Sequence, residues 1–203
     1  MSAKFIKPAK KGEGMFNAIY GGQYSKDYAY INGYYEGAVA LIEAALDKRP
    51  QDLMIYPVLY LTRHLIELHL KSIIRDVYEL RVSMFKFGEV KDEPAPLNDE
   101  KLTSTHKLDV LFNMMNEALS KVTSQKFDEK IKSAILDIHS SDPDGQTYRY
   151  SVKRGGAKSL PDPMLCDLNN FGTVLQDVHF YLLGVAMWVE NEHEERKSFY
   201  GSI

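Results

Sequence analysis

The sequence contains very little cysteine and no long apolar run. Cys166 is the only cysteine in 203 residues, so neither an intramolecular disulfide nor a cysteine-built metal site can form. A reducing, cytoplasmic compartment is therefore expected. The longest apolar stretches, such as 180–189, fall far short of the ~20 residues that a membrane span needs, and no apolar signal core follows the N-terminal lysines. We expect no membrane segment.

The chain also lacks a strong excess of charge of either sign. Lysine and arginine total 25 and aspartate and glutamate 28, which gives a net charge of −3. Hydrophobic residues make up 44% and charged residues 26%, the balance of an ordinary globular protein. Because the field of the whole molecule does not favour a polyanion, any affinity for nucleic acid must come from local basic patches.

Signature motifs of several enzyme classes are missing as well. The sequence contains no phosphate-binding loop, no nucleophile elbow and no zinc-ligand spacing. His139 and His179 have no partner at metal-ligand spacing, and His106 is assigned to the start of a helix. We therefore expect neither a metal site nor a cofactor.

Apolar periodicity predicts an all-α, up-down bundle of about five helices. Apolar residues recur at steps of three and four in each, and capping residues or prolines mark the ends. The predicted helices run from Ser25 to near Lys48; from about Asp52 to Arg81, with Pro57 in or near the first turns; after Thr105; after Ser124; and from Asp162, the cap before Pro163.

Segments outside this pattern divide the chain. Residues 1–24 are rich in lysine and glycine and are predicted to be a flexible basic tail. One helical domain is expected over 25–192, followed by a C-terminal tail over 193–203. Within the domain, 85–104 contains glycine, prolines and mixed charges, which predicts a long surface loop.

A second irregular segment covers about 142–160. It opens with Asp-Pro-Asp-Gly, a strong turn sequence. Tyr148, Tyr150 and Val152 then alternate with polar residues before two glycines. This pattern predicts a short β arm or hairpin near 147–158.

Four polar residues share one face of the predicted second helix. Arg63 and Glu67 are four residues apart, as are Glu67 and Lys71, and His64 lies beside them. One interpretation is a solvated face with modest i,i+4 ion pairs. The other is a reaction site, since a fixed cation, an imidazole, a carboxylate and an amine occur within two turns.

His69 lies at the edge of the apolar stripe of the same helix. A single histidine in that position is either packed in the core or catalytic, and the residues alone leave both interpretations open.

The arm is the second candidate site. It carries four cations without an acid among them, and tyrosines alternate with the first of them. Cations interleaved with aromatic rings suit single-stranded RNA, because phosphates pair with the charges and bases stack on the rings. The alternative is a hairpin whose tyrosines pack on the bundle. The candidate RNA-binding residues are Arg149, Tyr150, Lys153, Arg154 and Lys158.

The chain resembles the HEPN superfamily over about 27–190. The resemblance rests on YPVLYLTRHLIELHLK at 56–71, THKL at 105–108, DPDGQTYRY at 142–150 and the closing helix. It implies a helical bundle that forms a homodimer and, in many members, a metal-independent endoribonuclease with an arginine, four to six residues and a histidine. Arg63, five residues and His69 fit that pattern, with His64 as the polar neighbour.

The resemblance also implies a chemistry. The ribose 2′-hydroxyl would attack the adjacent phosphate, with His69 or His64 as acid or base and Arg63 holding the phosphate charge; Glu67 and Lys71 complete the catalytic set. The expected function is RNA cleavage by a homodimer whose interface includes this polar face. The resemblance also implies a role as a toxin or an anti-phage effector. Alternatives are a non-catalytic dimer that binds RNA, a nucleotide or a protein encoded in the same operon, and a structural adaptor docking through the acidic end of the last helix.

Overall fold

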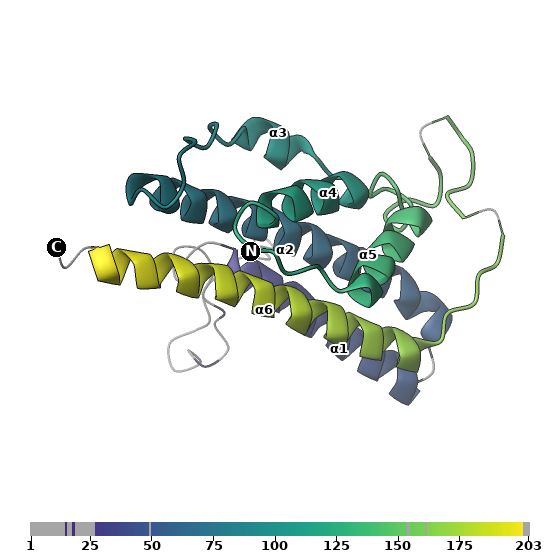
Figure 1. The fold of residues 1–203 in the computed structure, drawn as a ribbon. Helices are drawn as coiled ribbons and strands as arrows, with labels where there is room; N and C mark the ends of the chain where they lie inside the picture. The colour runs from purple at the N-terminus through teal and green to yellow at the C-terminus, as the bar shows by residue number, and fades with distance from the viewer. Residues whose placement is uncertain are drawn as a thin grey trace, which may run out of the picture.

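Six helices make up most of the described chain (Figure 1). The structure is a computed structural model that describes residues 15, 18, 27–48, 50–153, 155–160 and 162–200. The helices are α1 (Tyr28–Lys48), α2 (Gln51–Lys86), α3 (Asp99–Ser104), α4 (Leu108–Leu119), α5 (Glu129–Ser141) and α6 (Leu168–Tyr200). The predicted all-α bundle is confirmed, with α3 as a short sixth helix inside the predicted loop.

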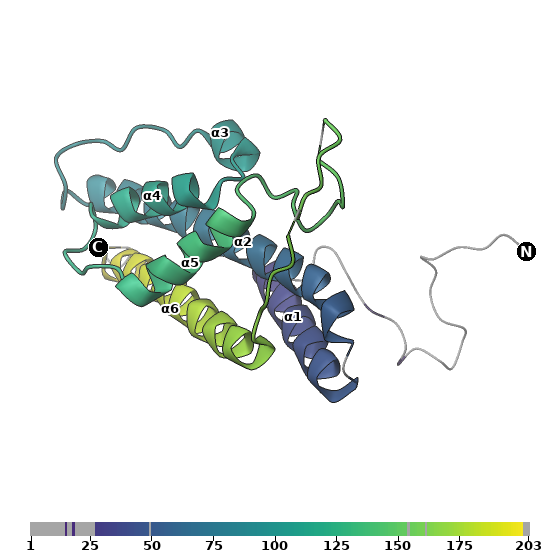
Figure 2. The same ribbon diagram turned by 90° about the vertical axis from the view of Figure 1, so that its right-hand side faces the viewer.

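The long helix α2 lies at the centre of the bundle. It packs mainly against α1, α4 and α6, and Figures 1 and 2 show these helices on different sides of it. Its apolar residues do not form one stripe: Val58 and Leu65 pack toward α1, whereas Ile66 and Leu70 belong to the core shared with α4 and α6. A helix that is apolar on several sides is stable only when neighbours cover it. Pro57 lies inside α2.

Several boundaries differ from those predicted, and local capping explains two of them. Helix α6 begins at Leu168 because the Asp167 carboxylate accepts hydrogen bonds from the amides of Asn169 (2.9 Å) and Asn170 (3.2 Å). The predicted cap, Asp162, lies six residues upstream, outside the helix. Asp128 caps α5 in the same way, so this helix begins later than a start directly after Ser124 predicts.

Tertiary contacts explain the other differences. The predicted C-terminal tail is helical as far as Tyr200, because Tyr200 stacks on Phe87 with ring centroids 4.2 Å apart and Arg196 pairs with Glu89 at 3.0 Å. In the predicted loop over 85–104, Leu102 is fully buried and anchors α3.

The segment between α5 and α6 forms the predicted arm, which stands away from the helices in Figure 2. An antiparallel bridge joins Val152 and Lys158, and the Ser159 amide donates to the Ser151 carbonyl at 3.0 Å. Gly156 turns the chain with φ of +89°. Ser25, Arg154 and the predicted tail over 1–24, apart from Met15 and Ala18, lie outside the described residues. No described helix is both long and apolar enough to cross a membrane.

Candidate functional site

The polar face of α2 is buried inside the monomer. Arg63, Glu67 and Lys71 expose only 4%, 5% and 6% of their surface. The interpretation as a solvated helix face is therefore wrong, and these three side chains are not available for the predicted dimer interface. The backbone segments at 103–106 and 142–145 cover them, a tertiary contact that helical periodicity cannot reveal.

The Arg63 guanidinium ties α2 to both covering segments. Its Nε donates to the Asp142 carbonyl at 3.1 Å, and Nη2 donates to the His106 carbonyl at 2.6 Å. The third nitrogen, Nη1, donates to Glu67 Oε2 at 3.2 Å. The fully buried Asp142 carboxylate lies 3.4 Å from Nε and adds a second negative charge. All three guanidinium nitrogens are thus occupied by protein oxygens.

The turn after α5 is shaped around this guanidinium. Asp142 accepts a hydrogen bond from the Thr147 amide at 2.9 Å, which closes the turn. Gly145 lies within it at φ of +76°, and a Cβ there would lie 3.1 Å from Arg63 Cζ and Nη1. The position therefore needs glycine both for its conformation and for the space.

Glu67 is the centre of the polar cluster. Its Oε1 accepts hydrogen bonds from Lys71 Nζ and from His106 Nδ1, each at 2.9 Å. Burial alone would raise the pKa of Glu67, but the hydrogen bonds from Lys71 and His106 hold its pKa below the usual value. Lys71 also donates to the Thr103 carbonyl at 2.9 Å. Glu67 is therefore a buried, ionised carboxylate at neutral pH.

His106 connects this buried carboxylate to the surface. Its side chain is 60% exposed although Nδ1 is held by Glu67, and no described residue bonds its other ring nitrogen, Nε2. A carboxylate that fixes one imidazole nitrogen orients the other for proton transfer. Sequence reasoning assigned His106 only to the start of a helix; its place in THKL at 105–108 was the available signal.

His64 lies half-buried beside the same pocket. Its ring packs edge-on against Tyr34, with centroids 4.6 Å apart, and is parallel to Tyr60 at 6.1 Å. Burial, reinforced by Lys71 and other nearby cations, lowers the pKa of His64, and Glu67 only partly opposes this shift. His64 is therefore a neutral imidazole at neutral pH.

A small pocket of about 140 Å³ brings these groups together with the arm. Its lining includes His64, Glu67 and His106 as well as Arg149 of the arm. The Arg149 guanidinium lies over the rings of Tyr60 (5.8 Å) and Tyr150 (5.3 Å).

Two further hollows continue along the arm. Arg149 and Tyr150 border one that includes Tyr56 and Lys158, and Tyr150 also borders one that includes Lys153. Four of the five predicted RNA-binding residues thus line hollows that share Arg149 or Tyr150, and the fifth, Arg154, lies outside the described residues.

His69 is not part of this pocket. It is 1% exposed, and its Nε2 forms a hydrogen bond of 3.0 Å with Nδ1 of His179, whose ring stacks on Tyr35 with centroids 3.8 Å apart. Burial lowers the pKa of His69 to about 3. His69 is therefore packed in the core, which is one of the two interpretations that the sequence left open. The fold does not place Arg63 and His69 at one site.

Comparison with known proteins adds no relative. No protein-family model matches the chain, and neither a curated protein nor a solved structure matches it. In the part of the chain that the structure describes, no three histidine, cysteine or acidic side chains gather as metal ligands would.

Proposed function

We propose that the protein is a metal-independent endoribonuclease that cleaves single-stranded RNA by acid–base catalysis. The observation that carries this proposal is the Glu67–His106 pair, which opens into a pocket shared with His64 and Arg149. The resemblance to the HEPN superfamily supports the same reaction class, with the catalytic roles moved from Arg63 and His69 to the residues that face the pocket.

The two histidines suit the two proton transfers of the reaction. His64, kept neutral by burial, takes the proton of the ribose 2′-hydroxyl while that oxygen attacks the adjacent phosphorus. The bond from phosphorus to the 5′-oxygen breaks, and His106 gives that oxygen the proton of Nε2. Glu67 holds Nδ1 of His106 and so orients the ring for this transfer. The products are a cyclic phosphate and a 5′-hydroxyl.

Arg149 and the arm supply the substrate contacts in this proposal. Arg149 is exposed at the pocket and holds a phosphate oxygen, whereas the nitrogens of Arg63 already have protein acceptors. Tyr56 and Tyr150, which line one of the hollows along the arm, offer faces on which unpaired bases stack. Arg63 and Lys71 are then positioning residues that hold the covering segments in place.

The direct test is incubation of the purified protein with single-stranded RNA in EDTA. We expect fragments that end in a cyclic phosphate, and a decrease of at least about 100-fold in rate for His106→Ala and for His64→Ala. His139→Gln is the control, since His139 pairs with Asp109 away from the pocket. Intact RNA, or cleavage that neither pocket histidine affects, contradicts the proposal.

A non-catalytic module that binds RNA, a nucleotide or a protein is the second candidate. The observation that favours it is the complete engagement of Arg63, because a buried ionic cluster of this kind also forms where it only fixes two loops. Binding of RNA without cleavage distinguishes it. Homodimerisation, cytoplasmic location, a toxin or anti-phage role and a partner encoded in the same operon are further parts of either proposal.

A further inference from the structure

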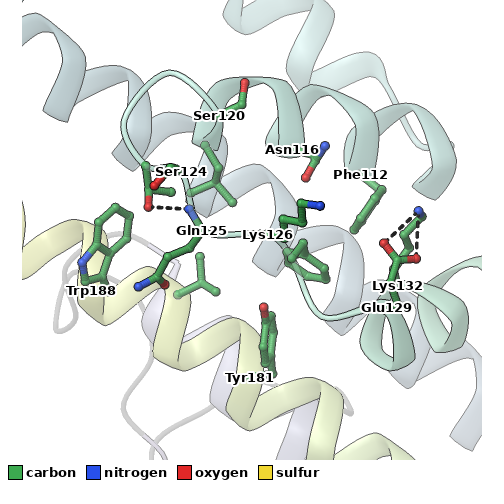
Figure 3. Close-up of a pocket in the computed structure, with 14 residues that line it drawn as sticks. Phe112, Asn116, Ser120, Ser124, Gln125, Lys126, Glu129, Lys132, Tyr181 and Trp188 are labelled. Carbon is green, nitrogen blue, oxygen red and sulfur yellow. Dashed lines mark hydrogen bonds and ion pairs between the residues drawn. The ribbon is translucent and has the colours of Figure 1, made fainter.

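A second, larger pocket lies at the opposite ends of α4 and α5 from the candidate site (Figure 3). It has a volume of about 400 Å³, within the range of small-molecule sites. The last turns of α4, the connection over 120–128, the start of α5 and the middle of α6 line it. His106 precedes α4 and Asp142 follows α5, so the two helices separate this pocket from the candidate site.

Half-buried aromatic rings form one wall of the pocket. Tyr181 and Trp188 are seven residues apart and lie on one face of α6, and Phe127 packs edge-on against Tyr181 with centroids 4.9 Å apart. Figure 3 shows Tyr181 and Trp188 at two separate places along α6, at the lower centre and the left of the pocket. These rings are only partly covered by protein, and a planar apolar ligand would complete their packing.

The charge in the pocket is a single uncompensated cation. Lys132 pairs with Glu129 at 3.1 Å, but no described carboxylate pairs with Lys126, whose side chain lies in the middle of the pocket in Figure 3. The Tyr181 hydroxyl accepts a hydrogen bond from the Asp128 amide at 2.9 Å, so its own proton remains to be donated.

We propose that this pocket binds a small aromatic carboxylate, with its ring against Trp188 and its carboxylate on Lys126 and the Tyr181 hydroxyl. One cation matches the single charge of a carboxylate, whereas the doubly charged phosphate of a nucleotide would leave a negative charge unpaired. The inference is independent of the proposed RNA cleavage, because it shares no residue with that site.

The chain has one tryptophan, so its fluorescence reports on this pocket alone. Titration with para-nitrobenzoate, whose nitroaromatic ring quenches tryptophan, should give saturable quenching, with calorimetry as a second readout. The neutral para-nitrobenzyl alcohol keeps the ring without the carboxylate, and acetate keeps the carboxylate without the ring. Each should bind at least about tenfold more weakly. Adenosine monophosphate tests whether the pocket binds a nucleotide instead.

Lys126→Ala should weaken para-nitrobenzoate binding about tenfold, as removal of a charge-assisted hydrogen bond does. Lys130→Ala is the matched control, because Lys130 is exposed on α5 but does not line the pocket. Trp188→Leu, followed by calorimetry, should weaken binding similarly, and His106→Ala should leave it unchanged. No saturable binding, equal binding of the neutral alcohol, or binding of adenosine monophosphate alone overturns the proposal.

Discussion

At the scale of single residues, burial decides what each polar side chain can do. Arg63 and His106 both contact Glu67, but Arg63 is surrounded by oxygens of the protein whereas His106 presents a ring nitrogen to solvent. His69 has neither a charged partner nor access to water. Arg63 and His69 are close together on the chain, yet the fold gives them separate roles.

Arg63→Ala should destabilise the protein by about 3–5 kcal/mol, because it leaves the Glu67 and Asp142 carboxylates buried with a cation removed. Urea unfolding measures the free energy. Arg75→Ala is the matched control: Arg75 is 35% exposed where it pairs with Asp27, and its removal should cost less than about 1 kcal/mol. Equal costs for the two variants would contradict the role of Arg63 in holding the covering segments on α2.

The His69–His179 pair should make stability depend on acid. The pKa of His69 is about 3 in the folded protein and about 6.5 when unfolded, so the unfolded chain binds more protons between these values. Stability is therefore full above pH of about 6.5 and falls by up to about 1.4 kcal/mol per pH unit below it. Unfolding free energies of His69→Leu should decline less steeply between pH 6 and 4; an unchanged slope would show that other groups cause the decline.

At the scale of secondary-structure elements, the periodic helices could be predicted and their junctions could not. Apolar spacing located α1, α2, α4, α5 and α6, because each of these helices buries residues three or four apart. The start of α6 was misplaced because Asp162-Pro163 and Asp167 are both acceptable caps locally. The covering of Glu67 by His106 depends on contacts 39 residues apart, which no local pattern contains.

The two candidate caps of α6 give a direct test. Asp167→Ala should cost about 1 kcal/mol, because it removes the acceptor of two amide hydrogen bonds. Asp162→Ala should change stability by less than about 0.5 kcal/mol. Thermal unfolding of both variants measures these costs. A larger cost for Asp162→Ala than for Asp167→Ala would mean that the helix begins near Asp162.

The turn around Arg63 offers a matched pair of glycines. Gly145 and Gly88 both have φ of +76°, but a Cβ meets the Arg63 guanidinium at Gly145 and nothing within 4 Å at Gly88. Gly88→Ala should cost about 1 kcal/mol for its backbone conformation alone. Gly145→Ala should cost about 1–3 kcal/mol more, because the guanidinium must shift. Similar costs, measured by urea unfolding, would show that the turn can move away from Arg63 freely.

At the scale of the whole molecule, the net charge is only −3, so attraction for a polyanion must come from a local group of cations. The arm carries such a group. Lys153 and Lys158 lie with Arg149 on a segment that projects from the bundle, as Figure 2 shows. The alternation of tyrosines and cations predicted this arm. The sequence could not show that it adjoins the Glu67–His106 pair, since the hollows are built from α2, the arm and the turn after α5.

Replacement of Arg149, Lys153 and Lys158 by alanine should weaken RNA binding and lower its salt dependence, by about one unit of logarithmic slope for each cation that no longer binds a phosphate. Binding measured over a range of salt concentrations gives the slope. Replacement of Lys48, Lys121 and Lys130 removes the same charge from exposed positions elsewhere and should leave the slope nearly unchanged. Equal effects of the two triple variants would mean that the arm has no special role.

The Arg63 side chain also determines when the pocket can form during folding. Its hydrogen bonds join residues 79 and 43 positions apart in the chain, so they close only after α4 and α5 have docked on α2. A growing chain that ends before Asp142 already carries Glu67 and His106, yet it lacks the turn that encloses the guanidinium. The pocket is therefore absent from any growing chain that ends before the turn after α5, and it forms only once that turn has closed around Arg63.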